Sequence, residues 1–212
     1  MMAWLPPVQH DFPKCWGVSR WAGSIVLRAW GWDIEGELPA TSKAVLIAAP
    51  HTSNWDFWFA LLAGWTYGVS IQWLGKDALF QGPLGPLLKL LGGISVDRSR
   101  NQGLVTAVVE RFESEPRLLL MVPAEGTRAY RDYWKSGFYH MAHDAGVPII
   151  LGFLDYRRKR AGFGPAFVPS GDLSQDMDRI RAFYTGISGK YPDQSSRIRL
   201  KGEDGVDEAR GA

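Results

Sequence analysis

Short runs of apolar residues alternate with longer stretches in which apolar residues recur every three or four positions. A short apolar run bounded by Pro, Gly or polar residues is typical of a buried strand. Six segments have this pattern and are predicted to be strands: 44–49, 69–74, 94–96, 118–122, 147–154 and 161–168. Because several of them are apolar throughout, we expect a sheet that is covered on both faces.

The periodic stretches predict helices between these strands. Helices are expected over 14–32, from Trp55 through 57–66, and over 83–91, 102–114, 137–145 and 173–187. Strands that alternate with helices in this way predict an α/β fold, a layered sheet flanked by helices. The chain contains no repeat and no low-complexity segment, and its 212 residues fit a single domain.

The expected N-terminal helix is amphipathic and rich in tryptophan. Its apolar residues can share one broad face, with basic residues beside it: Trp16, Trp21, Ile25 and Leu27, with Lys14, Arg20 and Arg28. A helix that lies in a membrane surface has this pattern, and so does an amphipathic helix that packs on its own domain. We therefore divide the chain into an N-terminal membrane-surface or packing segment, 1–34, a main domain, 35–200, and a polar tail, 201–212.

The longest uncharged run, 57–75, has the 19-residue length of a membrane span. Two glycines, Gly64 and Gly68, and the polar Ser70 and Gln72 interrupt it. Its pattern also changes from helical to strand-like. We expect a buried helix followed by a strand here, and no span.

Composition narrows the class of protein further. The formal net charge of +2 gives no reason to expect nucleic acid as a partner. The single cysteine, Cys15, cannot form an internal disulfide, which suits a reducing compartment. The first residues lack the basic and apolar regions of a secretory signal. These features favour a cytoplasmic location.

His51 and Asp56 form the first candidate site. The histidine follows a predicted strand, and the aspartate lies in the first turn of the next predicted helix. A carboxylate that accepts a hydrogen bond from one imidazole nitrogen leaves the other nitrogen to take a proton from a hydroxyl. The spacing has an alternative explanation, in which Ser53 and Asp56 form a capping box and His51 is a loop residue.

Residues 125–128 form the second candidate site. Glu125, Gly126, Thr127 and Arg128 follow the predicted strand 118–122, so all four emerge at one strand end. An arginine offers a planar, permanently charged fork that matches phosphate oxygens, and a glycine lets a ligand approach the backbone closely. A plain surface turn would have the same composition.

Taken in order, these motifs resemble the glycerolipid acyltransferase family, typified by 1-acylglycerol-3-phosphate acyltransferase, which is marked by four sequence blocks. Residues 51–56 match the first block, H-x-x-x-x-D, and 93–98 match the second, which ends in an acid and an arginine. Residues 125–128 are the third block, E-G-T-R, without change, and 147–149 match the fourth, V-P-[IV]. The resemblance spans about 44–151, and four weak motifs in the right order are together specific.

The resemblance implies a glycerolipid acyltransferase-like fold, an acyltransferase domain over 35–200, and a role for each motif residue. His51 would act as the general base and Asp56 would orient it. The phosphate or glycerol portion of the acceptor would bind to Arg98, Glu125, Gly126, Thr127 and Arg128. Further contacts are expected at Asn54, Lys76, Asp97 and Lys135.

The implied reaction moves a fatty acyl group from acyl-CoA or acyl carrier protein to a hydroxyl of a lysophospholipid such as 1-acylglycerol-3-phosphate. In the second block, Ser95 and Val96 replace the more common aromatic and apolar pair, so an aminolipid or a sugar is an alternative acceptor. A catalytically silent lipid-binding protein is a further alternative, although it would need neither His51 nor Asp56. A thioester hydrolase would use water in place of the acceptor.

The resemblance also implies where the protein acts and what it requires. We expect it at the inner face of the cell membrane, as a peripheral protein. No cofactor is expected. No metal is expected either, because His140 and His143 lie at helical spacing but no third ligand is evident. Cys15 has no neighbouring base that would make it a nucleophile.

Overall fold

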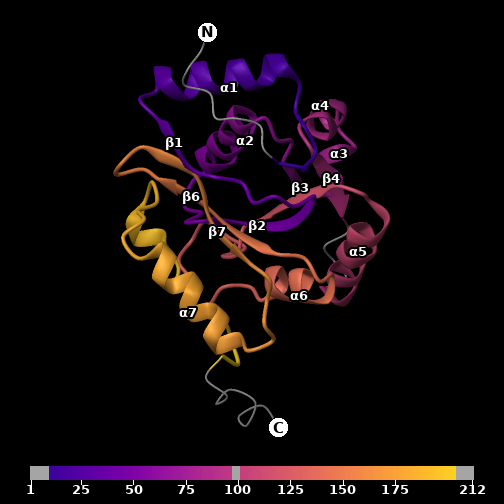
Figure 1. Ribbon diagram of the computed structural model, residues 1–212, viewed down its shortest axis with the longest axis vertical. Helices are drawn as coiled ribbons and strands as arrows, with labels where there is room; N and C mark the ends of the chain where they lie inside the picture. Colours follow the sequence, from indigo (N-terminus) through magenta and orange to yellow (C-terminus); the bar gives the residue numbers. More distant parts are fainter. Residues whose placement is uncertain (1–9, 97–100, 204–212) are drawn as a thin grey trace.

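The computed structural model describes residues 10–96 and 101–203, and its centre is a seven-stranded sheet (Figure 1). The strands are β1 (Asp33–Gly36), β2 (Lys43–Ala49), β3 (Gln72–Lys76), β4 (Gly93–Val96), β5 (Leu118–Val122), β6 (Ile149–Asp155) and β7 (Arg160–Phe167). Their order across the sheet is β1-β7-β6-β2-β5-β3-β4. Five neighbouring strands, β6 to β4, are parallel, and β7 pairs with β6 in the antiparallel direction.

Helices cover both faces of this sheet, which confirms the predicted α/β layers. They are α1 (Gly17–Ala29), α2 (Trp55–Tyr67), α3 (Asp77–Phe80), α4 (Gly85–Leu90), α5 (Asn101–Ser114), α6 (Gly137–Asp144), α7 (Leu173–Tyr184) and the short η1 (Pro192–Gln194). Figure 1 shows α1 and α2 on one side of the sheet and α6 and α7 on the other. None of the helices within 10–96 and 101–203 is long and apolar enough to span a bilayer.

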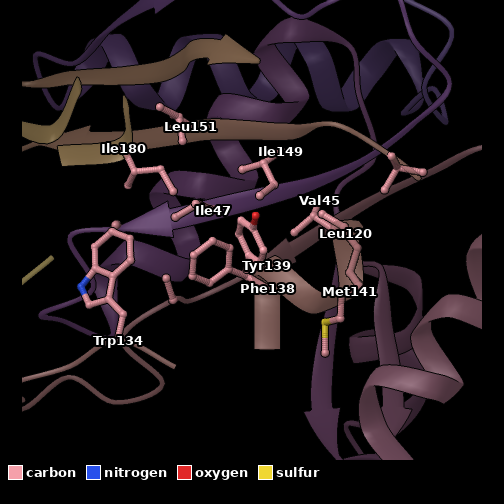
Figure 2. Close-up of a cluster of buried hydrophobic side chains, with 14 of the residues drawn as sticks. Val45, Ile47, Leu120, Trp134, Phe138, Tyr139, Met141, Ile149, Leu151 and Ile180 are labelled. Carbon is pink, nitrogen blue, oxygen red and sulfur yellow. The ribbon is translucent and has the colours of Figure 1, made fainter. Parts of the chain in front are cut away.

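The alternation of side chains along the central strands builds a separate core on each face. Val45, Ile47 and Leu120 point toward the layer of α5, α6 and α7, where they meet Phe138 and Ile180 (Figure 2). Leu46, Leu119 and Ile150 point the other way, toward α2 and the buried Phe12. Both faces are apolar because both are covered, which is why these strands read as continuous apolar runs.

The third strand begins later than its apolar run predicts. Val69 and Ile71 are fully buried, but they fill the core beside Phe12 before the strand starts at Gln72. The backbone at Val69 is already used, because its N–H donates to the Gly64 carbonyl at the end of α2. An apolar run marks burial, and here part of that burial belongs to a helix-ending turn.

Two elements carry no apolar signal and were not predicted. β1 reads Asp-Ile-Glu-Gly and is largely exposed, so it forms an edge strand on β7. Its close pairing depends on Gly162, where an added Cβ would lie 1.8 Å from the Glu35 carbonyl oxygen. The single turn α3 follows β3 directly.

The N-terminal helix α1 packs on α2 and is part of the same layered domain. It buries Gly23, Ser24 and Leu27, whereas Trp16 and Trp21 are 72% and 48% exposed. Leu27 therefore lies on the packed side, and not on the tryptophan face where the sequence placed it. The residues of α1 that pack on the domain thus lie on a different side of the helix from its exposed residues.

The described part of the predicted polar tail also contacts the domain. Glu203 is 4% exposed in its side chain and forms an ion pair with Arg181 of α7. The remainder of the tail, 204–212, lies outside the described residues.

Candidate active site

The parallel strands bring three distant segments together at their carboxyl ends. β2 runs parallel to β5 on one side and to β6 on the other. The loop from Pro50 to Asn54, the loop that begins at Pro123, and the end of β6 therefore meet at one edge of the sheet. Ligand sites of α/β folds form at this edge.

His51 and Asp56 face each other at this edge, as the sequence predicted. The Nδ1 atom of His51 lies 3.3 Å from Oδ2 of Asp56, with the side chains 20% and 6% exposed. An imidazole that gives its Nδ1 hydrogen to a carboxylate presents an unprotonated Nε2 on its other side. The pair can therefore accept a proton from a bound hydroxyl.

The Asp56 carboxylate accepts hydrogen bonds from three donors. Its Oδ2 accepts hydrogen bonds from the backbone N–H groups of Thr52 and Ser53, both at 2.8 Å. The Ser53 hydroxyl accepts instead from the Trp55 N–H, at 3.2 Å, so the reciprocal half of the expected capping box is missing. The carboxylate thus reaches back to the loop and also faces His51, which combines features of both explanations of the motif.

Tyr156 supplies the third donor and was not predicted. Its hydroxyl donates to Oδ1 of Asp56 at 2.6 Å, across 100 residues of sequence. Burial, and then the hydrogen bond to Asp56, raise the pKa of Tyr156 well above its ordinary value, so the hydroxyl keeps its proton. Tyr156 follows β6 directly, and only the pairing of β6 with β2 reveals that it lies beside Asp56.

Glu125 is buried and braces the site. One carboxylate oxygen accepts from the His51 N–H at 2.6 Å, and the other accepts from the Ser196 N–H at 2.9 Å. The side chain therefore ties the loop after β2 to the loop after β5 and to the C-terminal segment. Contact between Glu125 and an acceptor stays a prediction, but both of its oxygens already have partners.

The rest of the E-G-T-R motif lies at the surface of the site. Gly126 has a φ of +67°, and an added Cβ would lie 2.8 Å from the Lys135 side chain, so a larger residue would be strained and crowded. Thr127 and Arg128 line the same cavity as His51, and Asn54 joins them from the loop after β2. Lys135 is exposed and packs against Gly126.

The second block is placed only in part. Residues 93–96 form β4, and the expected contact residues Asp97 and Arg98 lie outside the described residues. Lys76 ends β3, where it pairs in register with Val96 of β4, and it is exposed. It does not line the cavity that contains His51.

The fourth block lies at the amino end of β6, on the opposite side of the sheet from the carboxyl ends that carry the site. Ile149 is the first residue of β6, and the carbonyl of the preceding Pro148 accepts a hydrogen bond from the N–H of Val45. This block therefore sets the register of β6 against β2. It contributes to the site indirectly, because the same strand carries Tyr156 at its other end.

An apolar cavity of about 600 Å³ runs between α2 and the sheet. His51 and Asp56 line it at the carboxyl edge, and its lining extends to Ile71 and Phe163 under α2. Small residues line it on both walls: Ala48, Gly152 and Gly162 from the sheet, with Ala60 and Ala63 from α2. We call this cavity the apolar channel.

A smaller hollow of about 280 Å³ adjoins the channel. Asn54 and Arg128 line both spaces. The other lining residues of the smaller one are Thr52, Ser53, Trp55, Tyr191 and Gln194. Lys190 lies above the Trp55 ring, with its Nζ 5.2 Å from the ring centre. We call this hollow the polar recess.

Comparisons with known proteins bear on the family and the fold of the chain. The family model described as Acyltransferase matches residues 33–150. The crystal structure of the 1-acyl-sn-glycerophosphate (LPA) acyltransferase PlsC from Thermotoga maritima is similar, with a TM-score of 0.57 and 14% sequence identity. The match covers 80% of this chain and 75% of that chain. The search of curated proteins gave no match.

The brace formed by Glu125 can be tested through stability. In Glu125→Gln, the amide nitrogen must face one of the two backbone N–H groups, so one buried hydrogen bond is lost. We expect the free energy of unfolding to fall by about 1.5–3 kcal/mol, measured by urea denaturation. The exposed Glu110→Gln is the matched control. An equal, small loss in both variants would contradict the brace.

Proposed function

Because the chain belongs to the acyltransferase family, we propose that this acyltransferase moves a fatty acyl group from a thioester to a hydroxyl of a lysophospholipid, with His51 as general base. The observation that carries the proposal is the placement of the His51–Asp56 pair at the end of the apolar channel. A base beside an apolar space of this size suits a reaction at the head of a long acyl chain.

The proposed reaction proceeds by direct transfer. The thioester carbonyl lies beside His51 and its acyl chain occupies the apolar channel. The unprotonated Nε2 of His51 removes the proton of the acceptor hydroxyl as its oxygen attacks the carbonyl carbon. The tetrahedral intermediate then collapses and the carbon–sulfur bond breaks. His51 returns the proton to the leaving sulfur, which departs as a thiol. Asp56 stabilises the imidazolium between these two steps.

A phosphate-bearing acceptor fits the charged groups at the mouth of the channel. Arg128 lines both the channel and the polar recess, where its guanidinium can meet phosphate oxygens near the reacting hydroxyl. The similar structure from Thermotoga maritima is named for a lysophosphatidic acid substrate, which makes 1-acylglycerol-3-phosphate our first choice of acceptor.

We further propose that α1 rests on the inner surface of the cell membrane. Val18 and Trp21 of α1 are exposed, as is the preceding Trp16. Trp30, which follows α1, and Trp55 are also exposed, and their rings lie 5.3 Å apart. Exposed tryptophans beside an apolar site suit a lipid–water interface. Failure of the chain to sediment with phosphatidylglycerol vesicles would contradict this part of the proposal.

Substitution of the general base tests the reaction itself. In His51→Ala, we expect thiol release from palmitoyl-CoA and palmitoyl-acyl carrier protein in the presence of 1-acylglycerol-3-phosphate to fall by about 10²- to 10⁴-fold. His140→Ala, an exposed histidine on α6, is the matched control and should keep full activity. Release that continues without acceptor would indicate a hydrolase, and release that is indifferent to His51 would overturn the proposed role.

Tyr156 should act on the reaction through Asp56. In Tyr156→Phe, the carboxylate loses one donor and attracts the His51 proton more strongly. We expect kcat to fall roughly tenfold, and the acidic limb of its pH profile to move to higher pH. KM should change little.

The chain offers a matched control for this substitution. Tyr139 donates to Asp176 at 2.9 Å in a second buried pair, on the other side of the sheet. Tyr139→Phe should reduce the free energy of unfolding without moving the pH profile. An unmoved pH profile in Tyr156→Phe would show that its hydrogen bond is only structural.

Filling the apolar channel should change the preferred acyl chain. In Ala60→Phe, the ring occupies space that the end of a long chain would need. Exclusion of two methylenes costs about 1.6 kcal/mol, so we expect kcat/KM for palmitoyl donors to fall roughly tenfold relative to shorter donors. Ala107→Phe, an exposed site on α5, is the control. Equal losses for all chain lengths would mean that the acyl chain lies elsewhere.

A further inference from the structure

Positive charge is concentrated on two segments that meet beside the polar recess. Residues 126–135 and 188–201 together contain seven basic residues and two aspartates, whereas the whole chain has a net charge of only +2. We call this surface the basic ledge, and its cations are Arg128, Arg131, Lys135, Lys190, Arg197, Arg199 and Lys201. Five of them are exposed, and Lys190 and Arg199 are half-buried.

Backbone contacts make the two segments one surface. The Trp134 N–H donates to the Arg199 carbonyl at 2.8 Å, and the Arg197 N–H donates to the Arg131 carbonyl at 3.1 Å. The Arg131 N–H donates to the Ser196 hydroxyl at 3.1 Å. The spacing of these cations is therefore set by the fold and not by flexible ends.

The charges of the ledge are available to a partner. Across 10–96 and 101–203, none of the seven cations forms an ion pair with a carboxylate. Arg199 stacks on Tyr133, with its guanidinium 4.2 Å from the ring centre, and Lys201 lies over the same ring. The nearby acid Glu203 is buried and paired with Arg181. An unneutralised basic surface of this kind attracts an acidic partner.

The ledge runs across the thickness of the domain. One end lies at Lys190, beside Trp55 of α2. The other end lies against α7, where Arg181 donates to the Ile198 carbonyl at 3.3 Å. Because α2 and α7 cover opposite faces of the sheet (Figure 1), the two ends of the ledge lie toward opposite faces of the domain. A protein seated on the carboxyl edge can meet both ends.

The polar recess connects the ledge to the reacting atoms. Tyr191 of the ledge segment donates its N–H to the Thr52 hydroxyl at 3.2 Å, and Thr52 is adjacent to His51 in sequence. A slender polar arm that enters between Trp55 and Tyr191 reaches the loop of the general base. Lys190, above the Trp55 ring, lies at this entrance and can meet a phosphate on the arm.

We propose that the basic ledge docks an acyl carrier protein, an acidic protein that bears its acyl group on a phosphopantetheine arm, and that this arm enters the polar recess. This inference rests on the proposed function, since it names the donor of the same reaction. The thioester then lies at His51, and the acyl chain continues into the apolar channel.

Two charge variants test the docking. Arg131→Gln/Arg197→Gln removes two ledge cations that lie outside the recess and the channel. Lys89→Gln/Arg117→Gln removes two exposed cations elsewhere, on α4 and before β5. At low salt, with saturating 1-acylglycerol-3-phosphate, the ledge variant should raise KM for palmitoyl-acyl carrier protein roughly three- to tenfold. KM for palmitoyl-CoA should change less than about twofold, and the control should match the wild type.

Three results would overturn the proposal. Equal increases in KM for both donors would mean that the ledge binds a group that they share. No change for either donor would mean that the ledge does not bind the donor. Loss of sedimentation with phosphatidylglycerol vesicles, with KM for palmitoyl-acyl carrier protein unchanged, would make the ledge a bilayer surface.

A binding measurement separates this proposal from the proposed reaction. Calorimetric titration with holo-acyl carrier protein needs no turnover, so it reports docking alone. If the wild type binds it and the ledge variant binds it roughly three- to tenfold more weakly, the docking stands even if no acyl transfer is found. If transfer from palmitoyl-CoA is found and holo-acyl carrier protein does not bind, the reaction stands and the docking fails.

Discussion

The candidate site depends on one buried carboxylate. Asp56 is 5% exposed, and a charge in that position is stable only if donors surround it. Three donors do so, the N–H groups of Thr52 and Ser53 and the Tyr156 hydroxyl, and the His51 ring lies 3.3 Å from the carboxylate. They come from the loop after β2 and from the end of β6. The requirement to satisfy Asp56 therefore fixes the loop, orients the imidazole and holds two parallel strands in register.

The apolar channel follows from the same arrangement of layers. Interiors of proteins are ordinarily close-packed, so a cavity of about 600 Å³ between α2 and the sheet needs residues that leave it open. Small side chains line both walls, while larger residues such as Leu119 and Ile150 pack the rest of that face. The strand ends place charged groups at one end of this apolar space, which gives a single site an acid–base pair and room for a chain.

Apolar patterns predicted the α/β layers and most of the helices. They could do so because burial against a sheet covered on both faces determines which positions of each strand and helix are apolar. They missed β1, whose exposed residues carry no such signal, and they began β3 too early, because Val69 and Ile71 are buried in a turn. The His51–Asp56 pair could be predicted because only four residues separate its members in the sequence. Tyr156 could not, because its contact with Asp56 depends on strand pairing across 100 residues.

Two long-range contacts place the site partly outside the segment that resembles the family. The family model matches residues 33–150, yet Tyr156 and Ser196 bind Asp56 and Glu125 from beyond that segment. Glu125 binds the His51 N–H with one oxygen and Ser196 with the other, so the C-terminal segment cannot move away without leaving a buried acceptor unpaired. The same segment supplies Tyr191 to the polar recess, and its Lys190 lies over the Trp55 ring. The motifs thus provide His51 and Asp56, whereas the segments that hold these two residues in place come partly from outside the matched region.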